Sequence, residues 1–247
     1  MVFLYILGGL ALFLIAYILF LAVCSLLVDP EKEYDSHSNF YRFLLVSASE
    51  MVLRILRVRV HVTGMEQIPA DVMPLFVGNH LSNYDPIVSW CVLKKWRPAF
   101  ISKASNFKVP IFGRFIRKCC FLAIDRENPR NALKTIYKAA ELLKRQEIAV
   151  AVYPEGTRSK TGKLLPFHNG VFKIAQKAGA PIVVLQISGT EKIYRNIPFH
   201  HTDVYLSVAS LICQDEVRSM RTDAIGERVK AALQGGQQGG VECFKRG

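Results

Sequence analysis

A histidine and an aspartate with four residues between them form the first group that could carry out chemistry. His80 and Asp85 lie in residues 78–86, GNHLSNYDP, directly after an apolar run. An aspartate that accepts a hydrogen bond from Nδ1–H would fix the imidazole tautomer, leave Nε2 free to take a proton, and stabilise the imidazolium that forms. A simpler interpretation is that Asp85 and Pro86 begin a helix, as N-cap and first helical residue, and the two roles are compatible.

A second polar segment, residues 153–159 (YPEGTRS), also follows an apolar run. Gly156 permits a tight turn that exposes backbone N–H groups, and Arg158 offers a planar fork suited to phosphate. Thr157 adds a hydroxyl donor. Glu155 does not suit an anion site, so we expect it to hold Arg158 or another cation in place. The alternative interpretation of the segment is an ordinary polar turn.

A third basic position is Arg126, in residues 124–126 (IDR), after the apolar residues 121–123. A cation at the end of a strand can face the same crevice as Arg158, because α/β proteins present functional groups at the carboxyl ends of their strands. The alternative is a surface ion pair with Asp125 or Glu127.

Alternating strand and helix patterns surround these segments and must position them. Apolar runs predict strands at 58–62, 75–77, 148–153, 181–187 and 204–213, and periodicity predicts helices from 86 onward and at 129–145, 170–178 and 222–233. Asn128 and Pro129 suit an N-cap and a first helical turn. The sequence therefore predicts an α/β fold, with a mostly parallel or mixed central sheet flanked by helices. We assign residues 58–234 to this domain and 235–247, which is rich in Gly and Gln, to a flexible tail.

The N-terminal residues 1–28 are predicted to be a transmembrane anchor. Residues 2–28 carry no charged side chain, and a helix of this length spans about 40 Å, enough to cross a bilayer. A cleaved signal peptide fits less well because no Lys or Arg precedes the run and the run is long. The following residues are rich in cations, which predicts a cell-membrane protein with its catalytic domain on the cytoplasmic side.

Residues 29–57 are predicted to hold an interfacial amphipathic helix, from about 40 to 56. Apolar residues alternate there with Arg42, Glu50 and Arg54, a pattern that suits the plane of a membrane surface. A helix that covers the core of the domain is an equally good interpretation.

The net charge of +12 indicates an anionic partner. Residues 94–118 contain eight Lys or Arg and no acidic residue, interleaved with aromatic and aliphatic side chains. This composition predicts contact with anionic membrane lipid, with a solvated charged face as the alternative. We expect no nucleic-acid partner, because no recognition motif is present. We also expect no metal site, because the cysteines show no Cys-x-x-Cys pair and His80 and Asp85 are too few as ligands.

Taken together, the motifs resemble the glycerolipid acyltransferase superfamily, and specifically the bacterial 1-acyl-sn-glycerol-3-phosphate acyltransferases. That family shows Asn-His-x4-Asp, then a segment with Lys, Pro and Gly that ends in Ile-Asp-Arg, then Phe-Pro-Glu-Gly-Thr-Arg-Ser, then an apolar strand containing proline. Here these motifs correspond to residues 79–85, Lys103 with Pro110 and Gly113, 124–126, 153–159 and 181–184. The resemblance covers about residues 58–190. Tyr153 replaces the usual phenylalanine, and a second proline is missing from the last motif.

The resemblance implies a lysophosphatidic acid acyltransferase that needs no cofactor. His80, oriented by Asp85, would take the proton of the sn-2 hydroxyl of lysophosphatidic acid, and the oxygen would attack an acyl thioester to give phosphatidic acid. The donor would be acyl-acyl-carrier protein or acyl-CoA. The resemblance places Lys103 near the thioester or the phosphate. The other substrate-binding residues that the resemblance implies are Arg126, Glu155, Gly156, Thr157 and Arg158.

Other functions remain open at the level of sequence. The same transfer could act on another lysolipid or on glycerol 3-phosphate. A non-catalytic membrane protein that binds anionic lipid would use the basic surface alone and would tolerate loss of His80. A lipid hydrolase is disfavoured because the chain has no Gly-x-Ser-x-Gly nucleophile elbow.

Overall fold

The protein is built around one mixed sheet of seven strands in the order β1-β7-β6-β2-β5-β3-β4. The computed structural model describes residues 1–69 and 71–235, so the predicted tail lies outside the described residues apart from Gly235. The strands are β1 (Val58–Thr63), β2 (Leu75–Gly78), β3 (Ala99–Lys103), β4 (Leu122–Ile124), β5 (Val150–Val152), β6 (Ile182–Ser188) and β7 (Thr202–Ile212).

Five neighbouring strands of the sheet run in the same direction. β6, β2, β5, β3 and β4 pair in parallel, whereas β7 is antiparallel to β6 and parallel to β1. All residues of the central strands β2 and β5 are buried, as expected for strands covered on both faces. The carboxyl ends of the five parallel strands therefore meet at one edge of the sheet, and this edge carries the site.

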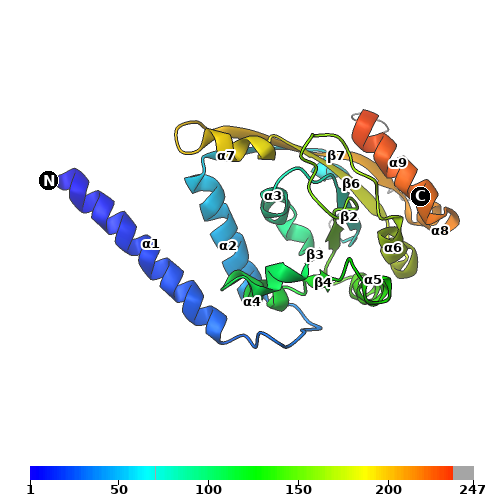
Figure 1. The fold of residues 1–247 in the computed structure, drawn as a ribbon, viewed down its shortest axis with the longest axis horizontal. Coiled ribbons are helices and arrows are strands. Elements are labelled where there is room, and N and C mark those ends of the chain that lie inside the picture. The colour runs from blue at the N-terminus through cyan, green and yellow to red at the C-terminus, as the bar shows by residue number, and fades with distance from the viewer. Residues whose placement is uncertain (70, 236–247) are drawn as a thin grey trace.

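Helices cover the two faces of the sheet (Figure 1). On one side lie α2 (Asn39–Ile55), α3 (Asp85–Val92) and α4 (Phe112–Lys118), and on the other α5 (Pro129–Lys144), α6 (Lys173–Ala178) and α9 (Thr222–Gly235). The short helices α7 (Ile193–Asn196) and α8 (Gln214–Ser219) flank β7. The architecture confirms the predicted α/β fold with a mixed sheet and flanking helices.

Most predicted elements have counterparts within a few residues of their predicted bounds. The N-cap at Asn128 is confirmed, because its side chain accepts hydrogen bonds from the backbone N–H groups of Arg130 (3.0 Å) and Asn131 (3.3 Å). Strand β3 was not predicted. Only its first two residues are buried and it ends at the exposed Lys103, so it lacks the continuous apolar run by which the other parallel strands were recognised.

The N-terminal helix α1 (Val2–Leu26) projects from the domain (Figure 1). Its segment Leu4–Leu26, with a mean hydropathy of 2.7, is the one helix among the described residues that is long and apolar enough to cross a membrane. Its C-terminal half lies against α2, where the Tyr17 hydroxyl is 2.7 Å from Ser47 Oγ and the Tyr41 hydroxyl donates to the Cys24 carbonyl (3.0 Å).

Helix α2 covers part of the core. The buried guanidinium of Arg42 donates to the carbonyl oxygens of Pro98 (3.1 Å) and Cys119 (2.8 Å), which ties the helix to β3 and α4. Phe43 and Ile55 remain 68% and 60% exposed. The packing agrees with the core-covering interpretation, and an additional role at a membrane surface stays a prediction.

Candidate active site

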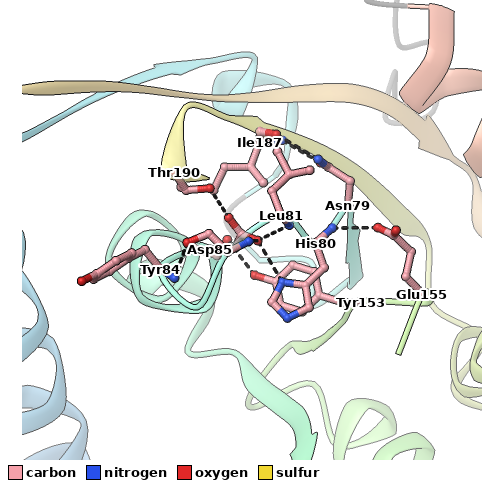
Figure 2. Close-up of polar contacts among 11 residues, drawn as sticks. Asn79, His80, Leu81, Tyr84, Asp85, Tyr153, Glu155, Ile187 and Thr190 are labelled. Atoms are coloured by element: carbon pink, nitrogen blue, oxygen red, sulfur yellow. Dashed lines mark hydrogen bonds and ion pairs between the residues drawn. The ribbon is translucent and has the colours of Figure 1, made fainter. Parts of the chain in front are cut away.

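His80 and Asp85 are in direct contact at the carboxyl end of β2 (Figure 2). Nδ1 of His80 lies 2.8 Å from Oδ2 of Asp85. The same oxygen accepts hydrogen bonds from the backbone N–H groups of Leu81 (2.6 Å) and Ser82 (2.7 Å), and Oδ1 accepts one from the hydroxyl of Thr190. Asp85 is fully buried. Its carboxylate therefore has all its partners within the protein, as a buried charged group requires.

This contact decides what the imidazole can do. Because the carboxylate can only accept, Nδ1 of His80 is the donating nitrogen, and Nε2 is left as a proton acceptor. Nε2 has no hydrogen-bond partner among the described residues, and Figure 2 shows it on the side of the ring away from Asp85. The side chain of His80 is 17% exposed. The pair is thus arranged as a general base with its orienting carboxylate.

Asp85 is not the N-cap that the sequence suggested. Helix α3 begins at Asp85, and the residue in the N-cap position is Tyr84. The carboxylate turns back toward Leu81 and Ser82, in the loop that precedes the helix, instead of toward the N–H groups of the first turn. Without the carboxylate, the N–H groups of Leu81 and Ser82 and Nδ1 of His80 would lose their acceptor, which is costly for groups shielded from water.

The backbone of His80 is held on both sides by residues 155–159. Its N–H donates to Oε1 of Glu155 (2.8 Å), and its carbonyl accepts from the N–H of Ser159 (2.8 Å). Oε2 of Glu155 accepts from the N–H of Leu165 (2.9 Å). The expectation that Glu155 pairs with Arg158 or another cation was therefore wrong. Both oxygens of this buried carboxylate are used to join the loop after β2 to two parts of the connection after β5, and no ion pair of Glu155 occurs within the described part of the chain.

The ring of Tyr153 packs against one face of the His80 imidazole. The two rings are stacked, with centroids 4.4 Å apart and planes 16° from parallel. The Tyr153 hydroxyl donates to Oγ of Ser89 (3.3 Å), and burial, together with the nearby charge of Asp85, raises the pKa of this phenol well above its ordinary value. The tyrosine therefore remains a neutral, fixed platform for His80. A phenylalanine would supply the same ring without the link to α3.

The buried amide of Asn79 joins the ends of β2 and β6. Its Nδ2 donates to the carbonyl of Ile187 (2.9 Å), and its Oδ1 accepts from the N–H of the same residue (2.8 Å). The chain then turns at Gly189, where φ is +90° and a Cβ would lie 2.4 Å from the carbonyl oxygen of Asp203. Only glycine fits there. This turn brings Thr190 to Asp85.

The expected cations lie along the same edge of the sheet. Lys103 is the last residue of β3, Arg126 follows β4, and Arg158 follows β5. All three therefore stand at or beyond the carboxyl ends of strands that run parallel to β2. All three side chains are exposed, and none has an ion-pair or hydrogen-bond partner within residues 1–69 and 71–235. The structure thus places them at the edge that bears His80 and leaves their charged groups available to a ligand.

The turn after β5 has the predicted shape. Gly156 has φ of +67°, and its N–H donates to the carbonyl of Tyr153 (3.0 Å). Thr157 is exposed beside Arg158. A Cβ at Gly156 would lie 2.9 Å from the ring of His168. A glycine is therefore required here both by the backbone angle and by the approach of a neighbouring side chain.

The sequence interpretation missed Asn79, Ser159 and Thr190 as residues that hold the His80–Asp85 pair, the dyad, in place. It noted Tyr153 only as a replacement for phenylalanine. Asn79 and Ser159 act through backbone partners that are far away in the sequence, which no local pattern reveals. Thr190 could have been found from its position. It carries a hydroxyl and lies just beyond the carboxyl end of a buried strand, and His80 occupies the same kind of position after its own strand.

Comparison with known proteins agrees with this site. The chloroplastic 1-acyl-sn-glycerol-3-phosphate acyltransferase BAT2 of Brassica napus is 34% identical over 170 residues, which are 64% of this chain and 48% of that protein. The 1-acyl-sn-glycerol-3-phosphate acyltransferase of Escherichia coli K12 is 34% identical over 116 residues, 47% of each chain. The chain spans about half the length of the curated relatives it matches.

The fold also matches a solved structure. The crystal structure of the 1-acyl-sn-glycerophosphate (LPA) acyltransferase PlsC from Thermotoga maritima superposes with a TM-score of 0.65 at 26% identity, covering 87% of this chain and 86% of that one. The model of the family described as Acyltransferase matches residues 59–188, more than half of the chain. This stretch contains His80, Asp85, Glu155 and all three cations, and Thr190 lies just beyond it. The chain therefore belongs to the Acyltransferase family.

Proposed function

We propose that the protein transfers an acyl group from an acyl thioester to the sn-2 hydroxyl of lysophosphatidic acid, giving phosphatidic acid. The observation that carries this proposal is the contact between His80 and the fully buried Asp85, with Nε2 left free at the edge of the sheet. The names of the relatives described above, two 1-acyl-sn-glycerol-3-phosphate acyltransferases and one 1-acyl-sn-glycerophosphate (LPA) acyltransferase, support the choice of acceptor.

The proposed reaction needs no nucleophile from the protein. Nε2 of His80 takes the proton of the sn-2 hydroxyl while the oxygen attacks the thioester carbonyl. The tetrahedral intermediate then expels the thiolate, which takes the proton back from the imidazolium. Asp85 stabilises that imidazolium and keeps the ring oriented. Base catalysis of this kind contributes about 10²–10⁴-fold, and holding both substrates together contributes several kcal/mol more.

The cations after β3, β4 and β5 are proposed to bind the substrates. Arg158 and Arg126 would hold the acceptor phosphate, assisted by the Thr157 hydroxyl, which the turn at Gly156 places beside Arg158. Lys103 stands between them in the sheet order and would contact the phosphate or the thioester. Glu155 contributes indirectly, because it fixes the backbone of His80 and the loop that bears Arg158.

Membrane association by α1 is consistent with a lipid acceptor. We further propose that the domain lies on the cytoplasmic side, following the excess of basic residues after α1. The cytoplasm would supply the donor as acyl-acyl-carrier protein or acyl-CoA. The basic surface at 94–118 would face anionic lipid headgroups.

The function is tested with the detergent-purified full chain. The protein would be incubated with acyl-acyl-carrier protein or acyl-CoA and with lysophosphatidic acid, other lysophospholipids or glycerol 3-phosphate, and products would be identified by mass spectrometry. We expect phosphatidic acid from lysophosphatidic acid. Product from another acceptor alone would reassign the substrate, and no product from any pair would favour a non-catalytic lipid-binding protein.

Substitution of Arg158 should mainly weaken use of the acceptor. A hydrogen bond to a charged group contributes about 1.5–3 kcal/mol, so Arg158→Ala is expected to lower kcat/KM for lysophosphatidic acid by about 10–100-fold. The KM for the donor should change little. The control is Arg221→Ala, at a position 88% exposed beside Asp223 and outside the site. An unchanged dependence of rate on acceptor concentration would contradict the phosphate role.

Loss of the Thr190 hydroxyl should slow turnover, because Oδ1 of the buried Asp85 would lose its only donor among the described residues. Thr190→Val keeps the side-chain shape and is expected to lower kcat by about tenfold or more, the effect of one charge-assisted hydrogen bond. Thr190→Ser keeps the hydroxyl and should restore most of the rate. If both variants lose stability equally while kcat per folded molecule is retained, Thr190 is structural only.

A further inference from the structure

The connection between β6 and β7 exposes aromatic side chains on the side of the molecule where α1 projects. We call residues 192–201, which include α7, the α7 loop. Phe199 is 79% exposed and Tyr194 is 60% exposed. Figure 1 shows α7 and the loop after it above the end of α2, toward the N-terminal half of α1. Two large, exposed aromatic side chains in one ten-residue connection make it a candidate interaction surface.

The α7 loop is ordered by contacts at its base. Ile193 is fully buried, and the amide of Asn196 donates to Oγ1 of Thr202 (2.9 Å). The carbonyl of Phe199 accepts from Nη1 of Arg57 (3.0 Å), which joins the tip of the loop to the junction of α2 and β1. Because the backbone is already fixed, presenting Phe199 to a partner would cost little conformational entropy.

Cations outnumber acids around these aromatics. Lys192 and Arg195 lie in the α7 loop, which itself contains no acidic residue, and Arg57 contacts the loop at the Phe199 carbonyl. Arg59 is paired in register with Asp203 just after the loop, and the exposed Glu191 immediately precedes it. Asp203, the nearest acid after the loop, is already in contact with His61 at 2.8 Å and with His201 at 3.4 Å. Aromatic rings surrounded by cations suit the interface of an anionic bilayer, where each basic residue contributes about 1 kcal/mol.

The α7 loop is also joined to the dyad. The ring of Tyr194 packs against Tyr84, with centroids 5.0 Å apart, and Tyr84 immediately precedes Asp85. Thr190, a few residues before α7, donates to the same carboxylate. Any partner that binds the α7 loop would therefore lie close to His80.

We propose that the α7 loop is a second membrane contact, separate from α1. Phe199 and Tyr194 enter the interfacial region of an anionic bilayer, and Arg57, Lys192 and Arg195 contact the headgroup phosphates. The proposal concerns the position of the domain on the membrane and does not depend on the acyl transfer proposed above.

The experiment uses the full chain reconstituted in vesicles of phosphatidylcholine and phosphatidylglycerol, with and without brominated acyl chains. Phe199→Trp introduces a fluorescent probe at the tip of the loop, and the native Trp90 and Trp96 are each only 4% exposed. The matched control is Tyr137→Trp, at a position 45% exposed on α5, on the opposite face of the sheet. The fluorescence of the unsubstituted protein is subtracted from both.

We expect the probe at position 199 to shift to shorter wavelength and to lose most of its emission to brominated lipid, while the control at position 137 stays accessible to a water-soluble quencher. Adding Arg195→Glu, or omitting phosphatidylglycerol, should weaken the shift. Equal behaviour of the two probes would overturn the proposal. Shielding of position 199 that appears only when acyl-carrier protein is added would also overturn it, because the occupant would then be a protein.

Discussion

His80→Ala is expected to lower the rate of acyl transfer by about 10²–10⁴-fold while the protein stays folded and bound to the membrane. The magnitude is that of a lost general base. The fold should be kept because the side chain lies at the edge of the sheet, and its backbone bonds to Glu155 and Ser159 do not need the imidazole. The measurement is the single-turnover rate of the purified variant with saturating donor and acceptor.

The chain contains a matched control for this experiment. His61 and Asp203 form a second histidine–aspartate pair with the same 2.8 Å separation, but on β1 and β7, with side chains 48% and 36% exposed. His61→Ala should leave the rate unchanged, because an exposed pair without a buried, fully hydrogen-bonded carboxylate is not poised to transfer a proton to bound substrate. Turnover that survives in purified His80→Ala would remove His80 as the base.

Asp85→Asn is expected to reduce both the rate and the stability. An amide cannot accept from all four donors that face Asp85, and its own NH₂ would oppose at least one of them. The imidazole would also be free to adopt the wrong tautomer. We expect a loss of about 10²–10⁴-fold in rate, comparable to the loss of the base itself.

A change in stability is expected to distinguish the Asp85→Asn variant from the His80→Ala variant. An unsatisfied buried donor costs about 1–3 kcal/mol, so Asp85→Asn should lower the free energy of unfolding by about that amount. Denaturant unfolding in detergent measures it, with Asp203→Asn at the exposed pair as the control. A variant that loses stability but retains its rate would show that Asp85 supports the loop and not the chemistry.

The local sequence was sufficient to predict the α/β class and the chemical groups. Continuous apolar runs predicted β2 and β6, since a strand buried on both faces must be apolar throughout. Polar residues just beyond the runs, His80 and Arg158 among them, were predicted to lie at one edge because parallel strands bring their carboxyl ends together. The short strand β3 was missed because it is only half buried and lies within a basic segment.

The supports of the dyad were decided by tertiary structure alone. Glu155 was expected to hold a cation because a carboxylate does not suit an anion site, yet it accepts hydrogen bonds from the backbone of His80 and Leu165. Thr190 meets Asp85 from 105 residues away, through the turn at Gly189.

There is a physical reason why the sequence predicted the reactive groups but not the hydrogen bonds that hold them. Residue type and the alternation of polar and apolar side chains act over a few neighbours, so the sequence by itself determines which strands are buried and which reactive groups stand at their ends. The hydrogen bonds that aim those groups depend on which loops the sheet order brings side by side, β6 next to β2 and β2 next to β5. That order arises only when the whole core packs, and it alone made Thr190, Glu155 and Tyr153 neighbours of His80 and Asp85.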